Sequence, residues 1–384
     1  MNLLLRAGAV ATAAIALSTP ALAADLKIGF ISSMSGPVSG LGIPYAKGIQ
    51  AAFAQHPLVA GRKVQLIMLD DTSDPAVAAR DARKLVAEDK VDALIGTSGV
   101  PGAMAIAAVA RETHTPLLSP TPINLPPGEG GWTVCITQPF PLMVAAVVDH
   151  MRANGVKTVA YIGFSDALGD LVYSSLEKAA GPAGIKIVAN ERYARSDTSI
   201  AGQVLKIIAA HPDAVLAGNS GSPGALPYLG LAERGYKGRL YGTHGLINAD
   251  FVRVAGASAD GLIVPSGPVM VADQLPAANP VRKVALEFQG AYKKSEGALP
   301  SDAFSAYTYD AYLVFADAAA RALKGGSEPG TAQFRAALRE AIGTTHELAG
   351  THGVYNFKPD DVYGLDQRSI VLIRLEKGQW KLVP

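Results

Sequence analysis

Short apolar runs alternate with longer amphipathic segments along most of the chain. The runs Lys27–Ser32, Val64–Leu69 and Thr158–Gly163 have the length of buried strands, and the segments between such runs repeat apolar residues at helical spacing. Asp74-Pro75 adds a helix-start signal, because Asp is a favoured N-cap and Pro suits the first helical position. Strands that alternate with helices predict βαβ units, in which parallel sheets are covered by helices on both faces.

This alternation occurs in two series. The first runs from Lys27 to Leu118, and the second begins near Pro139 and continues to about Val264. Longer helices are then predicted at 280–296, 303–323 and 331–342, and strand-like segments at 354–357, 369–376 and 380–383. Because no low-complexity linker separates the series, the sequence predicts two α/β lobes joined by short crossings, with a cleft between them.

Composition and charge exclude several classes of protein. Of the 384 residues, 49% are apolar and 17% are charged, which is typical of a globular chain rather than a disordered one. Lys and Arg number 34 against 33 Asp and Glu, and no basic run occurs, so we expect no contact with nucleic acid or an anionic membrane surface. The single cysteine, Cys135, excludes an intramolecular disulfide, and we expect a buried, inert thiol.

The first 23 residues have the pattern of a secretory signal peptide. Arg6 is their only charged residue, an apolar run follows from Ala7 to Leu17, and Ala21-Leu22-Ala23 forms an A-x-A cleavage site. The apolar run is shorter than the roughly 20 residues that a membrane span needs. We therefore expect cleavage after Ala23 and a mature protein in the periplasm.

Six loops rich in Gly, Ser, Thr and Pro follow predicted strands. In open α/β sheets, ligands bind beyond the carboxyl ends of the strands, where helix N-termini point. The loops span 33–42, 97–102, 119–123, 164–169, 219–223 and 243–248. Each loop alone is ordinary turn chemistry, but together they predict the lining of a ligand cleft.

Catalytic and cofactor motifs are missing from the sequence. It contains no G-x-S-x-G, G-x-G-x-x-G, G-x-x-x-x-G-K-[ST] or H-E-x-x-H motif. Asp70, Asp71 and Asp74 lack the length and the Gly of a calcium loop, and Asp74 is better explained as a helix cap. His346 and His352 flank a Gly turn and are expected to be solvated. We therefore predict a binding protein with no cofactor and no metal, and not an enzyme.

Five short motifs carry a family resemblance. They are Ile31–Pro37, Leu69–Asp71, Asp74-Pro75, Leu94–Gly96 and Leu118–Pro120. In order and spacing they resemble the periplasmic Leu/Ile/Val-binding proteins, the solute receptors of branched-chain-amino-acid-type ABC transporters. The resemblance covers essentially the whole chain after residue 23. It implies a monomeric receptor that captures a small molecule and docks on a membrane permease.

The resemblance also implies the type I periplasmic binding fold, in which two doubly wound parallel-sheet lobes are joined by three hinge crossings. The crossings are expected near 137–141, 264–267 and 350–357. Lobe 1 is expected to comprise residues 24–138 and 266–352, and lobe 2 residues 139–265 and 353–384. Closure of the lobes about the hinge then encloses the ligand.

Under this resemblance, the carboxylate-binding position of the family is altered. The serine that holds the carboxylate of an amino-acid ligand falls at Val100 here. Backbone donors remain at Val100, Gly102 and Ala103, at the N-terminus of a predicted helix that itself attracts anions. Ser98 offers a nearby hydroxyl, and Gly99 beside it is also predicted to contact the ligand. We therefore expect the ligand to keep a carboxylate.

The family positions that hold the ligand ammonium differ further. The threonine of the next loop falls at Ile123, and the small residue before it at Thr121. Two tyrosines of the second lobe fall at Leu168 and at or near Ser220, and the acidic residue that accepts the ammonium falls at His244. A desolvated ammonium without an anionic partner costs several kcal/mol, so an amino-acid ligand loses its main partner.

We therefore predict a small carboxylate without an amino group, with an aromatic acid of the hydroxybenzoate or cinnamate type preferred. Its carboxylate is expected at the helix N-terminus that follows Ser98, and a ring substituent is expected to reach His244 or Ser220. Leu41 and Phe164 are predicted to form apolar walls. Three alternatives stay open. They are a branched-chain or other amino-acid receptor, in which Asp166 accepts the ammonium, a chemoreceptor subunit with the same site but another partner, and an α/β enzyme that acts without a recognisable motif.

Overall fold

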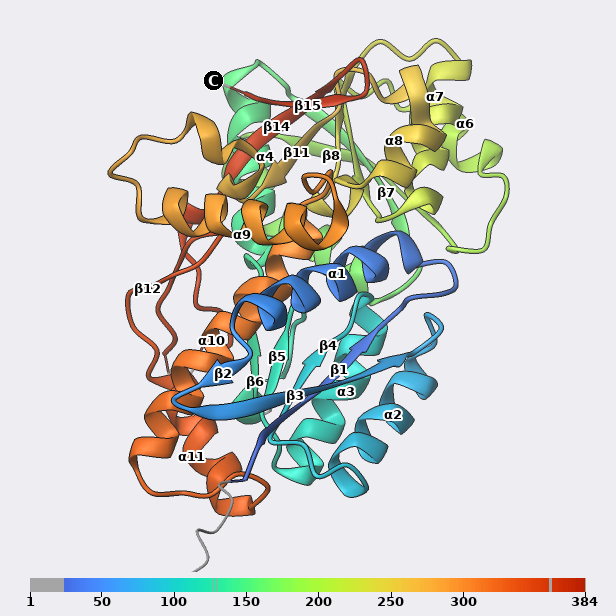
Figure 1. The fold of residues 1–384 in the computed structure, drawn as a ribbon. Coiled ribbons are helices and arrows are strands. Elements are labelled where there is room, and N and C mark those ends of the chain that lie inside the picture. The colour runs from blue at the N-terminus through green and yellow to red at the C-terminus, as the bar shows by residue number, and fades with distance from the viewer. Residues whose placement is uncertain (1–23, 127, 129, 359–360, 384) are drawn as a thin grey trace, which may run out of the picture.

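Two helix-covered sheets, one in each lobe, build the computed structural model (Figure 1). The structure describes residues 24–126, 128, 130–358 and 361–383. The predicted signal peptide, residues 1–23, lies outside these residues. Within the described part of the chain, no helix combines the length and the apolar character that crossing a bilayer requires.

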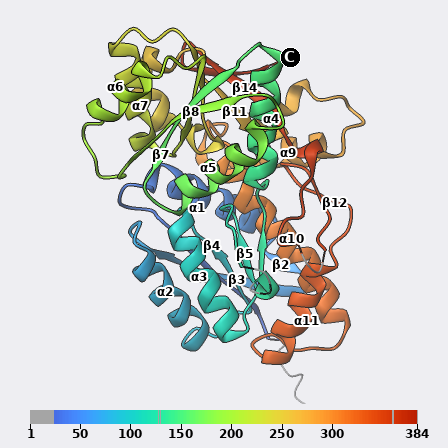
Figure 2. The ribbon, with the colours of Figure 1, turned by 180° about the vertical axis from the view of Figure 1, so that it is seen from behind.

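Lobe 1 is built on a six-stranded sheet. Its order is β2 (Leu58–Val59), β3 (Arg62–Asp70), β1 (Leu26–Ser32), β4 (Ala93–Gly96), β5 (Leu117–Ser119) and β6 (Thr133–Cys135). All neighbours are parallel except β2, which pairs antiparallel with β3. The helices of this lobe are α1 (Ser39–Gln55), α2 (Pro75–Ala87), α3 (Val100–Thr113), α10 (Phe304–Lys324) and α11 (Ala332–Gly343). α1 packs on α10 and α2 on α3, so both faces of the sheet are covered (Figures 1 and 2).

Lobe 2 is built on a seven-stranded sheet. Its order is β15 (Gln379–Leu382), β14 (Val371–Glu376), β11 (Ile263–Ser266), β10 (Arg239–Tyr241), β9 (Ala214–Gly218), β7 (Thr158–Phe164) and β8 (Lys186–Tyr193). The strands from β11 to β8 are parallel, whereas β14 and β15 run antiparallel to their neighbours. The helices of this lobe are α4 (Phe140–Ala153), α5 (Ala167–Ala180), α6 (Ala201–Ala209), α7 (Leu226–Glu233) and α8 (Ala249–Ala255). The two doubly wound lobes predicted from the sequence are confirmed.

The remaining elements connect the lobes or shape their loops. α9 (Pro280–Glu296) packs against α1 at the boundary between the lobes (Figure 1). β12 (Leu348–Ala349) and β13 (Val354–Tyr355) form a small antiparallel pair. The 3-10 helices are η1 (Gly130–Trp132), η2 (Ser222–Ala225), η3 (His244–Leu246), η4 (Gly256–Ala259), η5 (Pro268–Gln274) and η6 (Gln367–Ser369).

Burial and helix capping explain why these segments adopt their structure. Every residue of β4 and of β9 is buried, as expected for strands that helices cover on both faces. The Asp74 carboxylate accepts from the backbone N–H groups of Ala76 and Val77 at 2.7 and 3.2 Å, and Pro75 is the first residue of α2. The predicted N-cap at Asp74 is therefore confirmed.

Two element boundaries differ from the prediction. α1 begins at Ser39, so it includes four residues of the loop predicted at 33–42. The run Lys186–Ala189 in the second series predicts a strand that ends at Ala189, but β8 continues to Tyr193. The added residues 190–192 are polar, and a polar run is tolerated because β8 is an edge strand whose side chains reach solvent.

Gly42 allows the close approach of α1 to the end of β1. A Cβ at Gly42 would lie 1.9 Å from the carbonyl oxygen of Ser33, which is backbone and has little room to move. We expect Gly42→Ala to lower the free energy of unfolding by about 2 kcal/mol or more, because overpacking forces the backbone to shift. Gly202→Ala in α6 is the matched control, since a Cβ at Gly202 would meet no atom within 4 Å. Urea unfolding of both variants checks the prediction, which equal midpoints would contradict.

Buried polar contacts join the segments that cross between the lobes. The Tyr307 hydroxyl of α10 donates to Gln138 Oε1 at 2.6 Å, and Gln138 Nε2 donates to the Ser369 carbonyl at 2.8 Å. The ring of His352 stacks on Tyr307 with centroids 3.7 Å apart. We define Gln138, Tyr307, His352 and Ser369 as the hinge cluster. Residues near the first and the third predicted crossing thus meet at one point.

The expectation that His352 is solvated was wrong. The residue is fully buried, and its Nε2 lies 3.0 Å from the Ala303 carbonyl oxygen. Gly267 on another crossing passes so close that a Cβ there would lie 1.9 Å from His352 Nδ1. The residues next to His352 in the sequence predicted a solvated turn, but segments that are distant in the sequence enclose the imidazole ring.

Tyr355 of β13 and Tyr363 lie against lobe 1, although residues from 353 onward were predicted to belong to lobe 2. The Tyr355 hydroxyl donates to the Ile136 carbonyl at 2.9 Å, and Tyr363 forms a parallel bridge with Cys135. This segment thereby covers the otherwise open edge of β6. Cys135 is free and buried, as predicted, and burial raises the pKa of its thiol to about 12.

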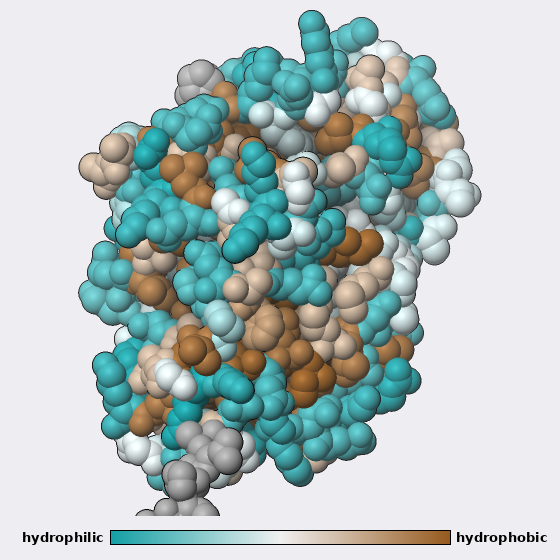
Figure 3. Space-filling model, viewed as in Figure 1, coloured by the Kyte–Doolittle hydropathy of each residue, from teal (hydrophilic) through white to brown (hydrophobic). Residues whose placement is uncertain are grey.

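Apolar surface is left partly uncovered on one face of lobe 1. Polar residues cover most of the face seen in Figure 3, and apolar area gathers in the region where Figure 1 shows β3. β3 lies beside the two-residue strand β2, and its apolar residues 66–69 are only partly buried. Area of this kind is common on globular surfaces.

Candidate functional site

A narrow cleft lies between the lobes, beyond the carboxyl ends of strands in both sheets. It is lined by Leu41, Tyr45, Ser98, Gly99, Val100, Thr121, Pro122, Phe140, Leu168, Arg195, Ser220, Thr243, His244, Gly245 and Phe304. Each of the six loops predicted from the sequence contributes at least one of these residues. The cavity volume is only about 20 Å³, so the lining residues of the two lobes lie close together across the cleft.

Most of the residues predicted to contact ligand line this cleft. They are Leu41, Ser98, Gly99, Val100, Thr121, Leu168, Ser220 and His244. Gly102, Ile123 and Phe164 are not among the lining residues. Ile123 is fully buried in the core, and a Cβ on Gly102 would meet Thr97 Cγ2 at 2.8 Å. Phe164 lies beneath the guanidinium of Arg195, 4.1 Å from its ring centroid, and so supports a lining residue instead.

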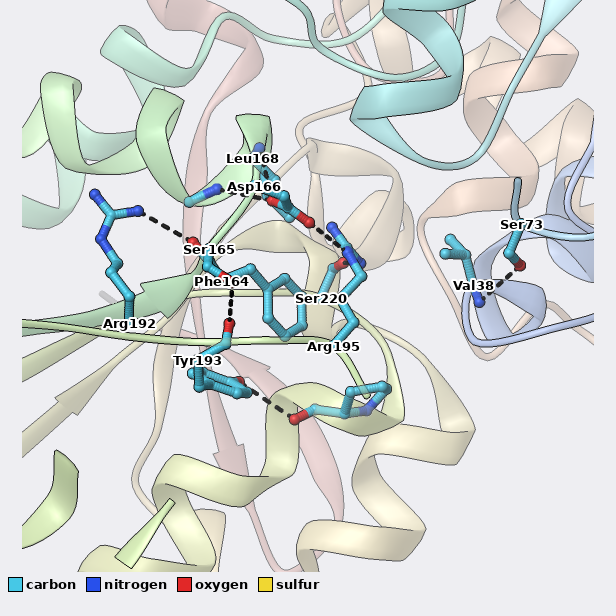
Figure 4. A network of polar contacts seen from close by, with 12 residues as sticks. Val38, Ser73, Phe164, Ser165, Asp166, Leu168, Arg192, Tyr193, Arg195 and Ser220 are labelled. Atoms are coloured by element: carbon cyan, nitrogen blue, oxygen red, sulfur yellow. Dashed lines mark hydrogen bonds and ion pairs between the residues drawn. The ribbon is translucent and has the colours of Figure 1, made fainter. Parts of the chain in front are cut away.

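Arg195, which the sequence analysis missed, is the cationic side chain of the cleft. Its Nε donates to Asp166 Oδ2 at 2.6 Å, and its Nη1 donates to Ser220 Oγ at 3.2 Å (Figure 4). Its Nη2 is buried and has no hydrogen-bond partner. Because guanidinium groups bind carboxylates through such N–H donors, Arg195 offers a carboxylate site.

The position of Arg195 follows from the length of β8. The strand ends at Tyr193, so Arg195 lies in a loop at its carboxyl end, like the other lining residues. The prediction ended this strand at Ala189 and therefore placed no cleft loop after it. The sequence did contain a signal for the longer strand. An edge strand permits charged residues such as Glu191 and Arg192, so the polar residues after Ala189 are compatible with a strand that continues.

Asp166 was the candidate acceptor for a ligand ammonium, but both of its oxygens are engaged. Oδ1 accepts from the backbone N–H groups of Leu168 and Gly169 at 2.9 and 3.3 Å, which caps α5. Oδ2 pairs with Arg195. Among the described residues that line the cleft, none is Asp or Glu. In the same described part of the chain, no group of three His, Cys, Asp or Glu side chains is placed to hold a metal.

His244 lies in the cleft as a neutral, buried ring. Burial lowers the pKa of this histidine to about 4, so the imidazole is uncharged at pH 7. Its centroid lies 5.4 Å from that of Phe140 and 5.9 Å from that of Phe304. Its Nδ1 is buried without a hydrogen-bond partner. A neutral imidazole offers one donor and one acceptor to a polar group of a ligand, but no charge.

The rim of the cleft is formed by loops from both lobes. In lobe 1, the Val38 backbone N–H donates to Ser73 Oγ at 3.1 Å, which fixes the loop before α1 (Figure 4). A Cβ on Gly221 of lobe 2 would lie 3.8 Å from the carbonyl oxygen of Pro37 in that loop. The lobes therefore meet next to Ser220, and closure buries the lining residues.

A larger cavity of about 1120 Å³ opens on lobe 1 beside α11 and β6. Its lining includes Trp132, Arg339 and Tyr363. It lies within one lobe, and none of the residues predicted to contact ligand lines it. The smaller cleft is therefore the better candidate site, because groups from both lobes converge there.

Comparisons with known proteins agree with this architecture. The family described as periplasmic binding protein matches residues 25–360. The chain is 26% identical to Leu/Ile/Val-binding protein homolog 3 of Brucella melitensis biotype 1, over 97% of this chain and 99% of that protein. It is 40% identical to an extracellular ligand-binding receptor from Rhodopseudomonas palustris HaA2, with a TM-score of 0.91 over 94% of this chain and 100% of the other. The leucine binding protein LivK of Thermotoga maritima MSB8 shares the fold at 24% identity, with a TM-score of 0.80 over 94% and 98% of the two chains.

The family match includes both sheets up to β13 and all the residues that line the cleft. The relatives are similar over nearly their whole length, so the likeness is not limited to one lobe. This chain therefore belongs to the periplasmic binding protein family, and it is a type I solute-binding receptor of the branched-chain amino-acid transporter type.

Proposed function

We propose that this receptor binds a small carboxylic acid without an amino group, with aromatic acids preferred, and delivers it to the permease of an ABC importer. The observation that carries the proposal is Arg195, a lining residue of the cleft whose buried Nη2 has no hydrogen-bond partner among the described residues. The described lining residues include no Asp or Glu. A carboxylate gains a charged hydrogen bond there, whereas an ammonium meets no anionic side chain.

The walls of the cleft support an aromatic ligand. Four of the lining residues carry rings, namely Tyr45, Phe140, His244 and Phe304. Leu168 adds an aliphatic surface. Rings pack well against one another in tilted or offset arrangements, and Phe140, Phe304 and His244 already adopt tilted geometries. A flat, apolar body with a single carboxylate matches this mixture of rings and donors.

In the proposed mechanism, the two lobes close on the ligand about the hinge cluster. Opening separates Arg195 and Ser220 on lobe 2 from Ser98 and Thr121 on lobe 1, and closure brings them together and excludes water. The permease then recognises the closed shape. Residues 1–23 are proposed to direct export, so that a monomeric receptor works in the periplasm.

The second candidate is a receptor for branched-chain amino acids. The name of the Brucella melitensis relative, a Leu/Ile/Val-binding protein homolog, favours it. In that case, neutral oxygens such as Thr121 Oγ1 must bind the ammonium, because Asp166 is engaged with Arg195 and the N-terminus of α5. The two candidates therefore differ in one chemical group of the ligand.

A thermal-shift screen of the protein that begins at Ala24 tests the proposal. The panel contains benzoates, hydroxybenzoates, cinnamates, leucine, isoleucine, valine and 4-methylpentanoate, which is leucine without its amino group. A ligand at about 1,000 times its Kd adds about 4 kcal/mol, which raises Tm by roughly 8 °C. We expect aromatic acids to raise Tm and leucine not to do so. A shift with leucine, isoleucine or valine alone would establish the second candidate and overturn the first.

A further inference from the structure

The hydroxyl groups of lobe 1 that line the cleft already donate their protons to hydrogen bonds within lobe 1. Ser32 donates to the Gly42 carbonyl at 2.9 Å, so the hydrogen bond of 2.8 Å between Ser32 and Ser98 must use the Ser98 proton. Ser98 Oγ also accepts from the Ser33 backbone N–H at 3.1 Å. Since a hydroxyl has one proton and two lone pairs, Ser98 retains only acceptor capacity toward the cleft.

The hydroxyl groups of Thr121 and Tyr45 also donate their protons within lobe 1. The Thr121 hydroxyl donates to the Thr97 carbonyl. The Tyr45 hydroxyl donates to the Pro120 carbonyl at 2.5 Å, and burial raises the pKa of Tyr45, which keeps this phenol protonated. All three side-chain oxygens on the lobe 1 side therefore have only lone pairs left for a further partner.

The lobe 2 side has the opposite character. Ser220 Oγ accepts from Arg195 Nη1 at 3.2 Å, and no described residue accepts the proton of Ser220. Arg195 Nη2 is a further donor without a partner. This side therefore offers N–H and O–H donors that suit an anion.

From this asymmetry we propose that the ligand spans the cleft, with its carboxylate on Arg195 and Ser220 and a hydroxyl at its far end against Thr121 and Ser98. The inference rests on the proposed function and makes it more specific: the substrate class is an aromatic acid with a hydroxyl opposite the carboxylate. It reverses the orientation expected from the sequence, which placed the carboxylate at the N-terminus of α3.

The reversed orientation follows from the hydrogen bonds that a ligand carboxylate and a ligand hydroxyl can each form with the lobe 1 side. A carboxylate there can accept from backbone N–H groups such as that of Val100, but it also faces three hydroxyl oxygens that have no proton to donate. A ligand hydroxyl accepts from the same backbone donors and gives its proton to Thr121 or Ser98.

Calorimetric titration of the protein with two ligand series tests the inference. The first is 4-hydroxybenzoate, benzoate and 4-methoxybenzoate, and the second is 4-hydroxycinnamate, cinnamate and 4-methoxycinnamate. In the series whose length fits, we expect the hydroxy acid to bind about tenfold more tightly than the parent and the methoxy acids, which have no proton to donate at that end. Equal affinities within both series would overturn the inference and leave the proposed function intact. Binding of leucine with no binding of any acid would overturn the proposed function itself.

Variants at Thr121 locate the hydroxyl. Thr121→Val removes the acceptor, and Thr121→Ser keeps it. The readout is the ratio of the Kd of the parent acid to that of the hydroxy acid, which is insensitive to a uniform loss of affinity. We expect the ratio to fall at least about threefold in Thr121→Val and to be restored in Thr121→Ser. An unchanged ratio in Thr121→Val would overturn the orientation. If Thr121→Val does not fold, the same ratio is measured in Ser98→Ala, where a fall supports the orientation and an unchanged ratio overturns it.

Discussion

Replacing Arg195 with Gln is expected to weaken the binding of an aromatic acid by about 100-fold, which corresponds to about 3 kcal/mol. The variant loses the charged donor Nη2 and the bond from Nη1 to Ser220. It also leaves the Asp166 carboxylate without its ion-pair partner next to the cleft, where this charge repels an anionic ligand. Both effects act in the same direction, so this substitution should have the largest effect on affinity.

Arg192→Gln is the matched control for Arg195→Gln. Arg192 lies at the end of β8, three residues before Arg195, and pairs with Asp170. Its guanidinium lies over the rings of Tyr161 and Tyr173, and it is not among the lining residues of the cleft. Calorimetry should show an affinity near that of the unmodified protein for Arg192→Gln and an intermediate affinity for Arg195→Lys, which keeps the charge without the planar fork. Equal losses in Arg192→Gln and Arg195→Gln would contradict a direct role for Arg195.

Stability is expected to fall steeply as the pH decreases from about 6.5 to 4. Burial lowers the pKa of His244 to about 4 and that of His352 to about 3. Between these values and the unfolded-state pKa of about 6.5, the unfolded chain binds protons that the native protein does not bind. Lowering the pH therefore favours unfolding, and the full stability is present only above about pH 6.5.

The size of this effect is several kcal/mol. The two histidines together remove about 6 kcal/mol by pH 4. Asp310 opposes them, because burial raises its pKa to about 6 and the native state then binds a proton before the unfolded state does. This carboxyl returns about 2 kcal/mol over the same range, and burial also raises the pKa of Asp92 and of Asp302, so we expect a net loss of at most about 4 kcal/mol.

Unfolding by urea at a series of pH values measures this prediction. In His352→Gln the slope of unfolding free energy against pH between 4 and 6 should become shallower, whatever the effect of the substitution at pH 7. His346→Gln is the matched control, because His346 lies six residues before His352 but is exposed. The same slope in His352→Gln as in the unmodified protein would contradict the assignment.

Much of the fold was predictable because it depends on patterns that are local in sequence. Buried strands such as β4 and β9 are short apolar runs, and Asp74-Pro75 marks a helix start by its own chemistry. The strand ends then indicated the six cleft loops, since parallel strands present their carboxyl ends at one edge of a sheet. Eight of the eleven predicted ligand residues line the cleft for this reason.

The rest depends on contacts between distant segments. Phe140 and Phe304 each stand at the first residue of a helix, and nothing near them in sequence shows that they face one cleft. His352 is buried by Ala303 and Gly267, which no local pattern could indicate. Arg195 was missed because the polar end of an edge strand looks like a loop.

The most direct test of the central claim is a calorimetric comparison of 3-(4-hydroxyphenyl)propanoate with tyrosine. The two compounds share ring, hydroxyl, chain length and carboxylate and differ only in the ammonium. We expect the propanoate to bind about 100-fold more tightly, because the cleft offers Arg195 to the carboxylate and no anionic side chain to the ammonium. Tighter binding of tyrosine would show that the cleft holds an ammonium and would contradict the proposal.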